Sequence, residues 1–196
     1  MPPMPCTDIE LPADEQHRLL LLARQAIAER WLDGGDCKDK PSTEPALLQR
    51  PAAAFVTLTQ NGRLRGCMGT MDAQRALAQE VIEDARSAAF RDLRFPPLTE
   101  AELDTIRIEI SILSPMQPIA AANREQLLKA LRPGVDGVLI ESGNQHATFL
   151  PQVWEQLPDG DDFLDHLLRK AGLDTQRWAD DMTAYCYQVQ HFSEPV

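Results

Sequence analysis

Residues 55–69 read FVTLTQNGRLRGCMG. Apolar and β-branched residues follow one another up to Asn61-Gly62, and a second strand-like run begins at Arg63. Asn and Gly both tolerate the positive φ angles of a type I′ turn, so two such runs separated by Asn-Gly predict a β-hairpin. The stretch therefore predicts two adjacent antiparallel strands with their turn at residues 61–62.

The second strand of this hairpin carries the most reactive side chain of the stretch. Successive strand residues point to opposite faces, so Arg65 and Cys67 would share one face while Leu64 and Met68 share the other. A guanidinium beside a thiol favours the thiolate, and the glycines on both sides of the cysteine leave its sulfur uncovered. Two interpretations stay open: a reactive or ligand-contacting cysteine, or a small buried hydrophobe whose neighbouring glycines mark a bulge.

A helix and a proline-containing loop are predicted directly after the hairpin. Asp72 is the expected N-cap of a helix that runs to about Ala89, with its positive end directed back toward the hairpin. Residues 90–98, FRDLRFPPL, cannot remain helical because two prolines restrict the backbone. We expect Asp92 to form a structural clasp that closes this loop. Arg94 is either part of that clasp or a group that contacts an anion.

Residues 106–112 alternate isoleucine with polar side chains, which predicts a half-buried antiparallel strand. Glu109 would lie beside Arg65 on a neighbouring strand, where it orients the guanidinium or acts as a general base. A plain cross-strand ion pair is the alternative. The arginines near the hairpin either gather into a basic patch or pair separately with the acidic excess; they are Arg63, Arg65, Arg91 and Arg94.

The remaining pattern predicts an α+β fold. Residues 1–11 are rich in proline and are expected to be loosely held, and apolar residues at helical spacing follow up to Gly34-Gly35. Two prolines in 114–119 mark the expected boundary between two lobes, and a second hairpin is predicted around 143–145. We expect a single domain over 12–194, with mainly antiparallel sheet, packed helices, and two lobes around a shared cleft.

Composition excludes several classes of function. The chain has 196 residues, a net charge of −11 and a hydrophobic fraction of 43%, so duplex nucleic acid and anionic membranes are not expected partners. The four cysteines have no C-x-x-C spacing and the four histidines no H-x-x-x-H spacing, so neither a metal site nor a cofactor is predicted. His146 or His191 would serve as a base if the fold brings it to Cys67. Without a signal peptide or an apolar run of ~20 residues, we expect a cytoplasmic protein with reduced thiols.

Five segments resemble the AmmeMemoRadiSam system protein A family, named for the Alport syndrome, midface hypoplasia and elliptocytosis chromosomal region. They are LRGCMG at 64–69, D-x-R-F-x-P at 92–97, E-I-S at 109–111, L-P-Q-V at 150–153 and K-A-G-L at 170–173. The match spans roughly Leu19 to Glu194 and implies the same architecture. Many relatives carry a cysteine just before K-A-G-L. This chain reads His166-Leu-Leu-Arg169 there, so no role of a second thiol carries over.

The expected site is centred on Cys67, with Glu109 as the acid/base assistant. Arg65 would favour the thiolate or hold an anionic group of the substrate. Backbone N–H groups of Gly66–Gly69 would stabilise a developing oxyanion. The full set of expected substrate contacts is Arg65, Gly66, Met68, Gly69, Arg94 and Gln152. The Gln152 amide either binds a small polar ligand or ties down a loop.

These residues predict a cysteine-dependent enzyme, or an enzyme component, that acts on a small anionic metabolite in the inter-lobe cleft. The family name implies a pathway shared with a Memo-type protein and a radical SAM protein as partners. This chain lacks the C-x-x-x-C-x-x-C spacing of the radical SAM member, so it would be an accessory or downstream component. The alternative is a non-catalytic protein-interaction module or adaptor.

Overall fold

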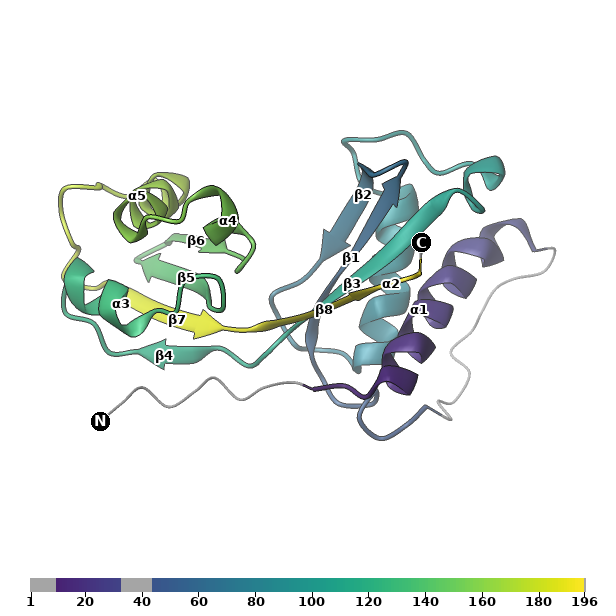
Figure 1. Ribbon diagram of the computed structural model, residues 1–196, viewed down its shortest axis with the longest axis horizontal. Helices are drawn as coiled ribbons and strands as arrows, with labels where there is room; N and C mark the ends of the chain where they lie inside the picture. The colour runs from purple at the N-terminus through teal and green to yellow at the C-terminus, as the bar shows by residue number, and fades with distance from the viewer. Residues whose placement is uncertain (1–9, 33–43, 196) are drawn as a thin grey trace. The chain divides into compact units, whose positions relative to one another are not determined.

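The structure, a computed structural model, describes residues 10–32 and 44–195 and divides into two compact units (Figure 1). The larger unit comprises Glu10–Leu113 together with the chain from Gln190 onward, and the smaller unit comprises Ser114–Val189. Most of the segment expected to be loosely held lies outside the described residues, as do Cys6 and Cys37. Leu11, at the end of that segment, is buried and donates its N–H to Oε1 of Gln190, so it is held in place.

Each unit contains one four-stranded sheet, and the strand pairs are antiparallel. The α+β fold class predicted from the sequence is therefore confirmed. In the larger unit the strand order is β2-β1-β3-β8, and in the smaller unit it is β4-β7-β5-β6. The elements of the larger unit are α1 (Ala13–Ala28), η1 (Glu29–Trp31), β1 (Ala53–Gln60), β2 (Arg63–Gly69), α2 (Leu77–Phe90), η2 (Glu100–Glu102), β3 (Ile106–Leu113) and β8 (Val189–Ser193). Those of the smaller unit are β4 (Gln117–Ile119), α3 (Arg124–Ala130), β5 (Gly137–Ser142), β6 (Gln145–Phe149), α4 (Val153–Gln156), α5 (Gly160–Ala171) and β7 (Thr183–Tyr187).

The predicted Asn-Gly hairpin is confirmed. Asn61 and Gly62 have φ angles of 52° and 73°, the left-handed values that a type I′ turn requires, and β1 pairs with β2 across them. One face of the sheet is apolar and packs against α1 and α2, which both lie on the same side of it (Figure 1). The fully buried strand residues of this core include Val56, Leu58, Ile108 and Ile110.

A β-bulge in β2 overturns the predicted pairing of side-chain faces. Thr57 lies opposite Cys67, but Thr59 lies opposite Leu64, and Arg65 is the extra residue of the bulge. Because Thr57 and Thr59 point to the same face of β1, Leu64 shares a face with Cys67 and Arg65 does not follow the expected alternation. The prediction that Arg65 and Cys67 stand side by side on one face was therefore wrong.

Helix α2 begins at Leu77, five residues after the predicted start at Asp72. The N–H of Asp72 bonds to Oγ1 of Thr70, and a β-bridge joins Pro51 to Ala76. These contacts keep residues 70–76 in a turn, so Asp72 does not cap the helix. The predicted helix end near Ala89 agrees with the observed end at Phe90.

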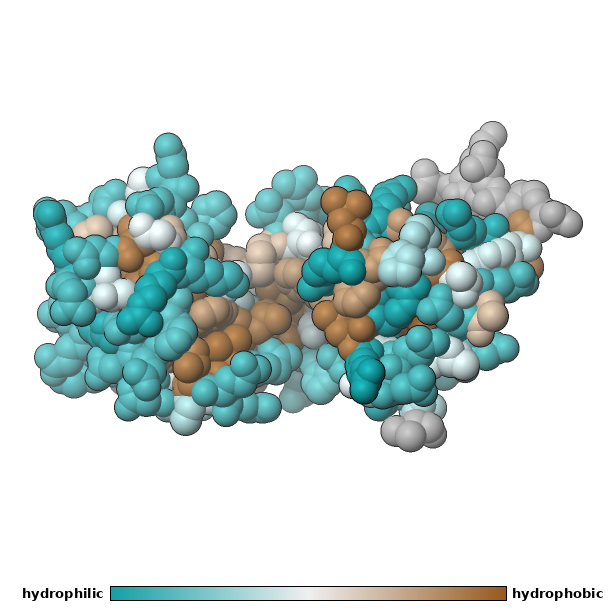
Figure 2. Space-filling view, turned by 90° about the horizontal axis from the view of Figure 1, so that it is seen from above, coloured by the Kyte–Doolittle hydropathy of each residue, from teal (hydrophilic) through white to brown (hydrophobic). Residues whose placement is uncertain are grey.

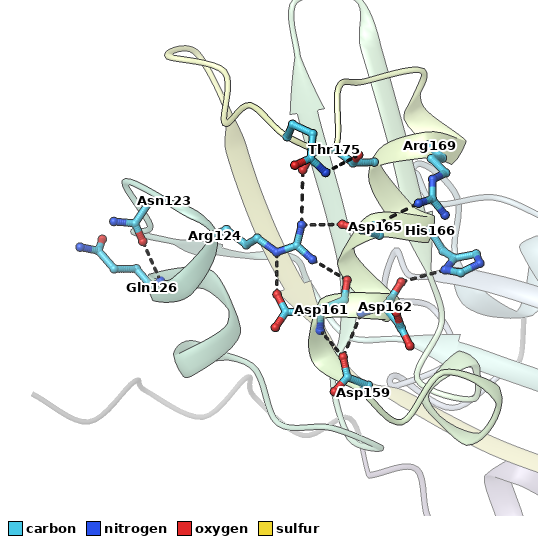
Figure 3. A network of polar contacts seen from close by, with 11 residues as sticks. Asn123, Arg124, Gln126, Asp159, Asp161, Asp162, Asp165, His166, Arg169 and Thr175 are labelled. Atoms are coloured by element: carbon cyan, nitrogen blue, oxygen red, sulfur yellow. Dashed lines mark hydrogen bonds and ion pairs between the residues drawn. The ribbon is translucent and has the colours of Figure 1, made fainter.

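The smaller unit packs α3, α4 and α5 on its sheet. Trp154 stacks on Phe163 with ring centroids 3.7 Å apart, and both rings are buried in the core of this unit. Arg124 at the start of α3 donates to Asp161 and Asp165 of α5 and to the carbonyl of Thr175, so it ties the two helices together (Figure 3). The α5 turn that receives these bonds is also the turn capped by Asp159.

Helix lengths and hydropathy bear on membrane insertion. Over the described ranges 10–32 and 44–195, we find no helix with both the length and the apolar character needed to cross a bilayer.

Candidate functional site

Polar side chains form a row across the face of the larger sheet opposite to α1 and α2. Thr57 of β1 lies directly between Cys67 of β2 and Glu109 of β3 in the strand register. His191 of β8 continues the row, with Nε2 3.5 Å from Oε2 of Glu109. We call Cys67, Thr57, Glu109 and His191 the polar row. Each member is at least partly exposed, whereas Val56, Leu58, Ile108 and Ile110 on the opposite face are fully buried.

Spacing within the polar row separates two chemical groups. Oγ1 of Thr57 donates to Sγ of Cys67 at 3.3 Å, a contact that supports negative charge on the sulfur. Neighbouring strands lie about 4.8 Å apart, so the backbones at Cys67 and Glu109 are about 10 Å apart. Of the two histidines proposed as bases, His191 therefore contacts Glu109 and not the thiol. His146 belongs to the smaller unit, on β6.

The free edge of β2 is held at Cys67 by two side chains from the loop after α2. Asp92 accepts the Cys67 N–H at Oδ2, with N and O 2.9 Å apart. Arg94 donates from Nη2 to the Cys67 carbonyl at 3.2 Å. In an antiparallel pair, these two backbone groups point away from β1 and would bond to a further strand. Asp92 and Arg94 take the place of that strand, and we call them the edge clasp.

The edge clasp is itself a close ion pair. Oδ1 and Oδ2 of Asp92 accept from Nε and Nη2 of Arg94 at 2.9 and 2.7 Å. The guanidinium of Arg94 holds the pKa of Asp92 well below its ordinary value, and the N–H of Cys67 adds to this. The pKa of Arg94 is raised, mainly by Asp92 and further by contact with the Cys67 side chain. The expected clasp role of Asp92 is therefore present, and Arg94 is the guanidinium that donates to the Cys67 backbone.

Arg65 has other partners than those predicted. Its Nε and Nη2 donate to the two carboxylate oxygens of Glu102 at 2.7 and 3.1 Å, and Nη1 donates to the Pro96 carbonyl at 3.0 Å. These bonds hold the pKa of Glu102 down at about 2, chiefly through the Arg65 guanidinium. Arg65 thus joins the hairpin to η2 and its side chain is buried. The expectation that Glu109 orients Arg65 was wrong, because Glu102 fills that role.

The other residues of the hexapeptide pack against protein. A Cβ on Gly66 would stand 2.2 Å from the Ala88 carbonyl oxygen, so this glycine allows β2 to approach α2 closely. A Cβ on Gly69 would overlap the Phe55 ring, and Met68 lies opposite Val56 on the helix-facing side. Gly66 and Met68 are thereby accounted for by packing.

Of the backbone N–H groups expected to stabilise an oxyanion, the structure leaves one directed outward. The Cys67 N–H is taken by Asp92. Thr70 bonds to Ala54, so the alternation of an antiparallel ladder directs the N–H of Gly66 and Met68 toward β1. By the same alternation the Gly69 N–H points to the free edge. Gly69 is thus the hexapeptide donor that the ladder leaves directed outward.

Gln152 lies in the smaller unit, where it is exposed at the start of α4. Its carbonyl accepts the Glu155 N–H in the first turn of that helix. In the K-A-G-L segment, Gly172 has a φ of 76° and ends α5, and Lys170 Nζ donates to the Thr148 carbonyl at 3.0 Å. These two family segments have structural roles in their own unit, and a ligand contact of Gln152 stays a prediction.

Sequence reasoning missed Thr57 and Glu102. The alternation in residues 55–59 places Thr57 on the face opposite to Val56 and Leu58, and this pattern was a usable signal. The T-E-A-E pattern at 99–102 is typical of a capping box, which the structure contains, but it does not indicate Arg65 as the partner of Glu102. Across the described part of the chain, no three His, Cys, Asp or Glu side chains gather in a way that would hold a metal ion.

Comparisons with known proteins agree over nearly the whole chain. The AMMECR1 family model matches residues 20–192. A protein of Methanothermobacter thermautotrophicus is 37% identical over 186 residues, which is 94% of this chain and 96% of the relative. A protein of Methanosarcina acetivorans is 38% identical over 177 residues, or 88% of each chain. The crystal structure of an uncharacterized protein of Pyrococcus horikoshii superposes with a TM-score of 0.81 at 30% identity, covering 95% of this chain and 94% of that one. The chain belongs to the AMMECR1 family.

Proposed function

We propose that the chain is a cysteine-dependent enzyme, or a component of one, that acts on a small anionic metabolite. Cys67 is the nucleophile of this proposal, and Arg94 binds the anionic group of the ligand. The observation that carries it is the position of Cys67. It is partly exposed on the sheet face opposite to α1 and α2, its Sγ accepts a hydrogen bond from the Thr57 hydroxyl, and its carbonyl accepts one from the Arg94 guanidinium.

Arg94 suits the anion-binding role better than Arg65. The Arg94 side chain is 57% exposed although it is paired with Asp92, so its outer face is open to a ligand. Arg65 is 10% exposed and its guanidinium is occupied by Glu102 and the Pro96 carbonyl. In the proposed site the outward N–H of Gly69 supplies a further donor for a developing negative charge.

Glu109 and His191 serve as the proton-transfer pair of the proposal. They lie about two strand spacings from the thiol, or about 10 Å, so they would act on a distant part of the ligand. His191 and Glu109 are 52% and 36% exposed in their side chains, so solvent can exchange protons with them. The ligand would therefore span the polar row from Cys67 to Glu109.

The cellular setting is also part of the proposal. A cytoplasmic location would keep the Cys67 thiol reduced, and a pathway shared with Memo-type and radical SAM proteins follows from the family name. The small anionic ligand would then be an intermediate of that pathway.

Ligand protection of Cys67 tests the proposed function. Purified protein is treated with iodoacetamide in the presence of single anionic metabolites, and alkylation of each cysteine is measured by peptide mass spectrometry. A ligand of the site should slow alkylation of Cys67 at least ~5-fold and leave Cys186, in the smaller unit, unchanged. Equal alkylation of Cys67 with every metabolite tested would count against the enzyme.

A second candidate function, a protein-interaction module, is favoured by one observation. Leu93, between the two clasp residues, is 99% exposed, and Leu64, on the face of the polar row, is 44% exposed. Apolar side chains also reach the surface among hydrophilic ones where the larger unit is viewed from the hairpin end (Figure 2). Protection of Cys67 by a purified Memo-type or radical SAM protein, lost in Leu93→Ser and absent with all metabolites, would support the module.

A further inference from the structure

We propose that Asp92 is a positioning residue, which holds the Arg94 guanidinium against Cys67 so that this charge activates the thiol. The proposal deepens the proposed function, because it rests on Cys67 being the reactive group there. It assigns the activating charge to the edge clasp and gives Arg65 no part in the reactivity of Cys67.

The geometry of Asp92 fits a residue that acts through another. Its side chain is 5% exposed, and both oxygens are occupied: Oδ1 by the N–H and Nε of Arg94, Oδ2 by Nη2 of Arg94 and by the Cys67 N–H. The carboxylate itself therefore has no oxygen left for a substrate. It grips the Arg94 guanidinium at two points, and this fork geometry sets the plane of the guanidinium.

The same carboxylate also fixes the strand that bears the thiol. By accepting the Cys67 N–H while Arg94 donates to the Cys67 carbonyl, the clasp holds the peptide groups on both sides of the cysteine at the free edge of β2. An edge strand without such partners would be free to twist away. Thiol and guanidinium are thus held in one frame by one buried carboxylate.

The contacts of Arg65 exclude it as the source of positive charge at Cys67. Arg65 belongs to a bulge and donates to Glu102 at both carboxylate oxygens. Pairing with a carboxylate does not separate the two arginines, because Arg94 is paired with Asp92. Their positions do: Arg94 Nη2 also donates to the Cys67 carbonyl at 3.2 Å, whereas Arg65 is directed to Glu102 and the Pro96 carbonyl.

The test measures the rate of Cys67 alkylation by iodoacetamide from pH 6 to 10, without any ligand, in four variants. Arg94→Met and Asp92→Asn should each lower the rate at pH 7 about fivefold or more, while Arg94→Lys keeps most of it. The difference in rate between the variants should be largest near pH 7 and shrink toward pH 10. Arg91→Met is the matched control, because it removes a guanidinium from an exposed pair with Glu83 and should leave the rate unchanged.

A double variant separates positioning from an independent effect. Asp92→Asn combined with Arg94→Met should react no more slowly than Arg94→Met alone, because Asp92 acts through Arg94. If Asp92→Asn does not fold, raising NaCl from 0.05 to 1 M is the second measurement: it should slow the wild type and leave Arg94→Met unaffected.

Three outcomes would overturn the inference. They are a wild-type rate in Arg94→Met, a rate deficit of equal size at every pH, and additive losses in the double variant. None of them depends on a ligand, so failure here leaves protection of Cys67 by metabolites measurable. Conversely, a lack of metabolite protection would refute the proposed function without altering these rates.

Discussion

Replacing Asp84 by Asn should stabilise the larger unit above neutral pH and leave it unchanged in acid. Asp84 lies on α2 and is 7% exposed. Among the described residues nothing hydrogen-bonds to its Oδ2. Glu80, one helical turn earlier, is 3% exposed and is paired with Arg75 at 3.3 Å. Burial raises the pKa of Asp84 from its ordinary 3.8 to about 7, and the like charges of Glu80 and Glu83 add to this.

The sign follows from proton binding. Below about pH 4 the carboxyl is protonated in both the folded and the unfolded chain. Between pH 4 and 7 the unfolded chain ionises while the folded one keeps its proton, so the free energy of unfolding falls as the pH rises. Above pH 7 the folded protein carries the full cost of a buried charge. The raised pKa sets a ceiling of about 4 kcal/mol on that cost.

Relaxation around a buried carboxylate reduces such a cost, so we expect about 2 kcal/mol. Asp84→Asn keeps the shape of the side chain and removes the charge. Its free energy of unfolding should exceed that of the wild type by about 2 kcal/mol at pH 8 and match it within about 0.5 kcal/mol at pH 4.

The assay is urea unfolding at pH 4, 6, 7 and 8. The extent of unfolding is monitored by pulsed hydrogen exchange of the peptide that covers α2, at one fixed labelling pH. Asp72→Asn, an exposed acid of the same unit, is the control and should change stability by less than about 0.5 kcal/mol at every pH. A gain for Asp84→Asn that is the same at pH 4 and pH 8, or no gain at pH 8, would refute the reasoning.

Three further substitutions test single contacts, two of them beside the site and one in the smaller unit. Gly66→Ala should lower the free energy of unfolding by about 2 kcal/mol or more in urea, because the new methyl meets the Ala88 carbonyl at 2.2 Å; unchanged stability would mean that β2 moves freely over α2. Glu102→Gln should cost about 2 kcal/mol at pH 7 by leaving the buried Arg65 guanidinium without its carboxylate. The depressed pKa of Glu102 makes that difference shrink as the pH falls from 4.5 toward 2, and a pH-independent cost would contradict it. Arg124→Met should destabilise the smaller unit by about 1–2 kcal/mol in tryptophan-monitored unfolding, because four acceptor atoms lose their donor; a change near zero would make this network a surface feature only.

Local rules were sufficient where a residue type admits few backbone conformations. Asn61-Gly62 predicted the hairpin because both residues adopt positive φ, and both do. The strict alternation of residues 106–112 predicted a half-buried strand, and β3 has its isoleucines on the buried face. The start of α2 was misplaced because Asp72 satisfied a capping rule locally while a bridge from Pro51 to Ala76 held the segment in a turn.

The site could be predicted only in part, because its geometry depends on distant partners. The alternation of side chains along a strand predicted that Arg65 shares a face with Cys67. The bulge that overturns this prediction arises from the pairing of β2 with β1. The arginine that donates to Cys67, Arg94, is 27 residues further along the chain, and nothing in the local pattern of residues 90–98 shows that Asp92 aims it at β2. Register and loop closure are tertiary properties, so a sequence pattern names the candidates without arranging them.

The roles of the hexapeptide residues bear on the choice between a structural and a reactive cysteine. Arg65 joins the hairpin to η2, Gly66 allows β2 to approach α2 closely, and Met68 faces the helices. Each of these residues therefore has a structural role. Cys67 faces the other way and is only partly buried, so a small core hydrophobe is not what its position requires. Serine or alanine would fill the same space. In the proposed function this thiol is the nucleophile, and Asp92 and Arg94 keep the strand edge that carries it in place.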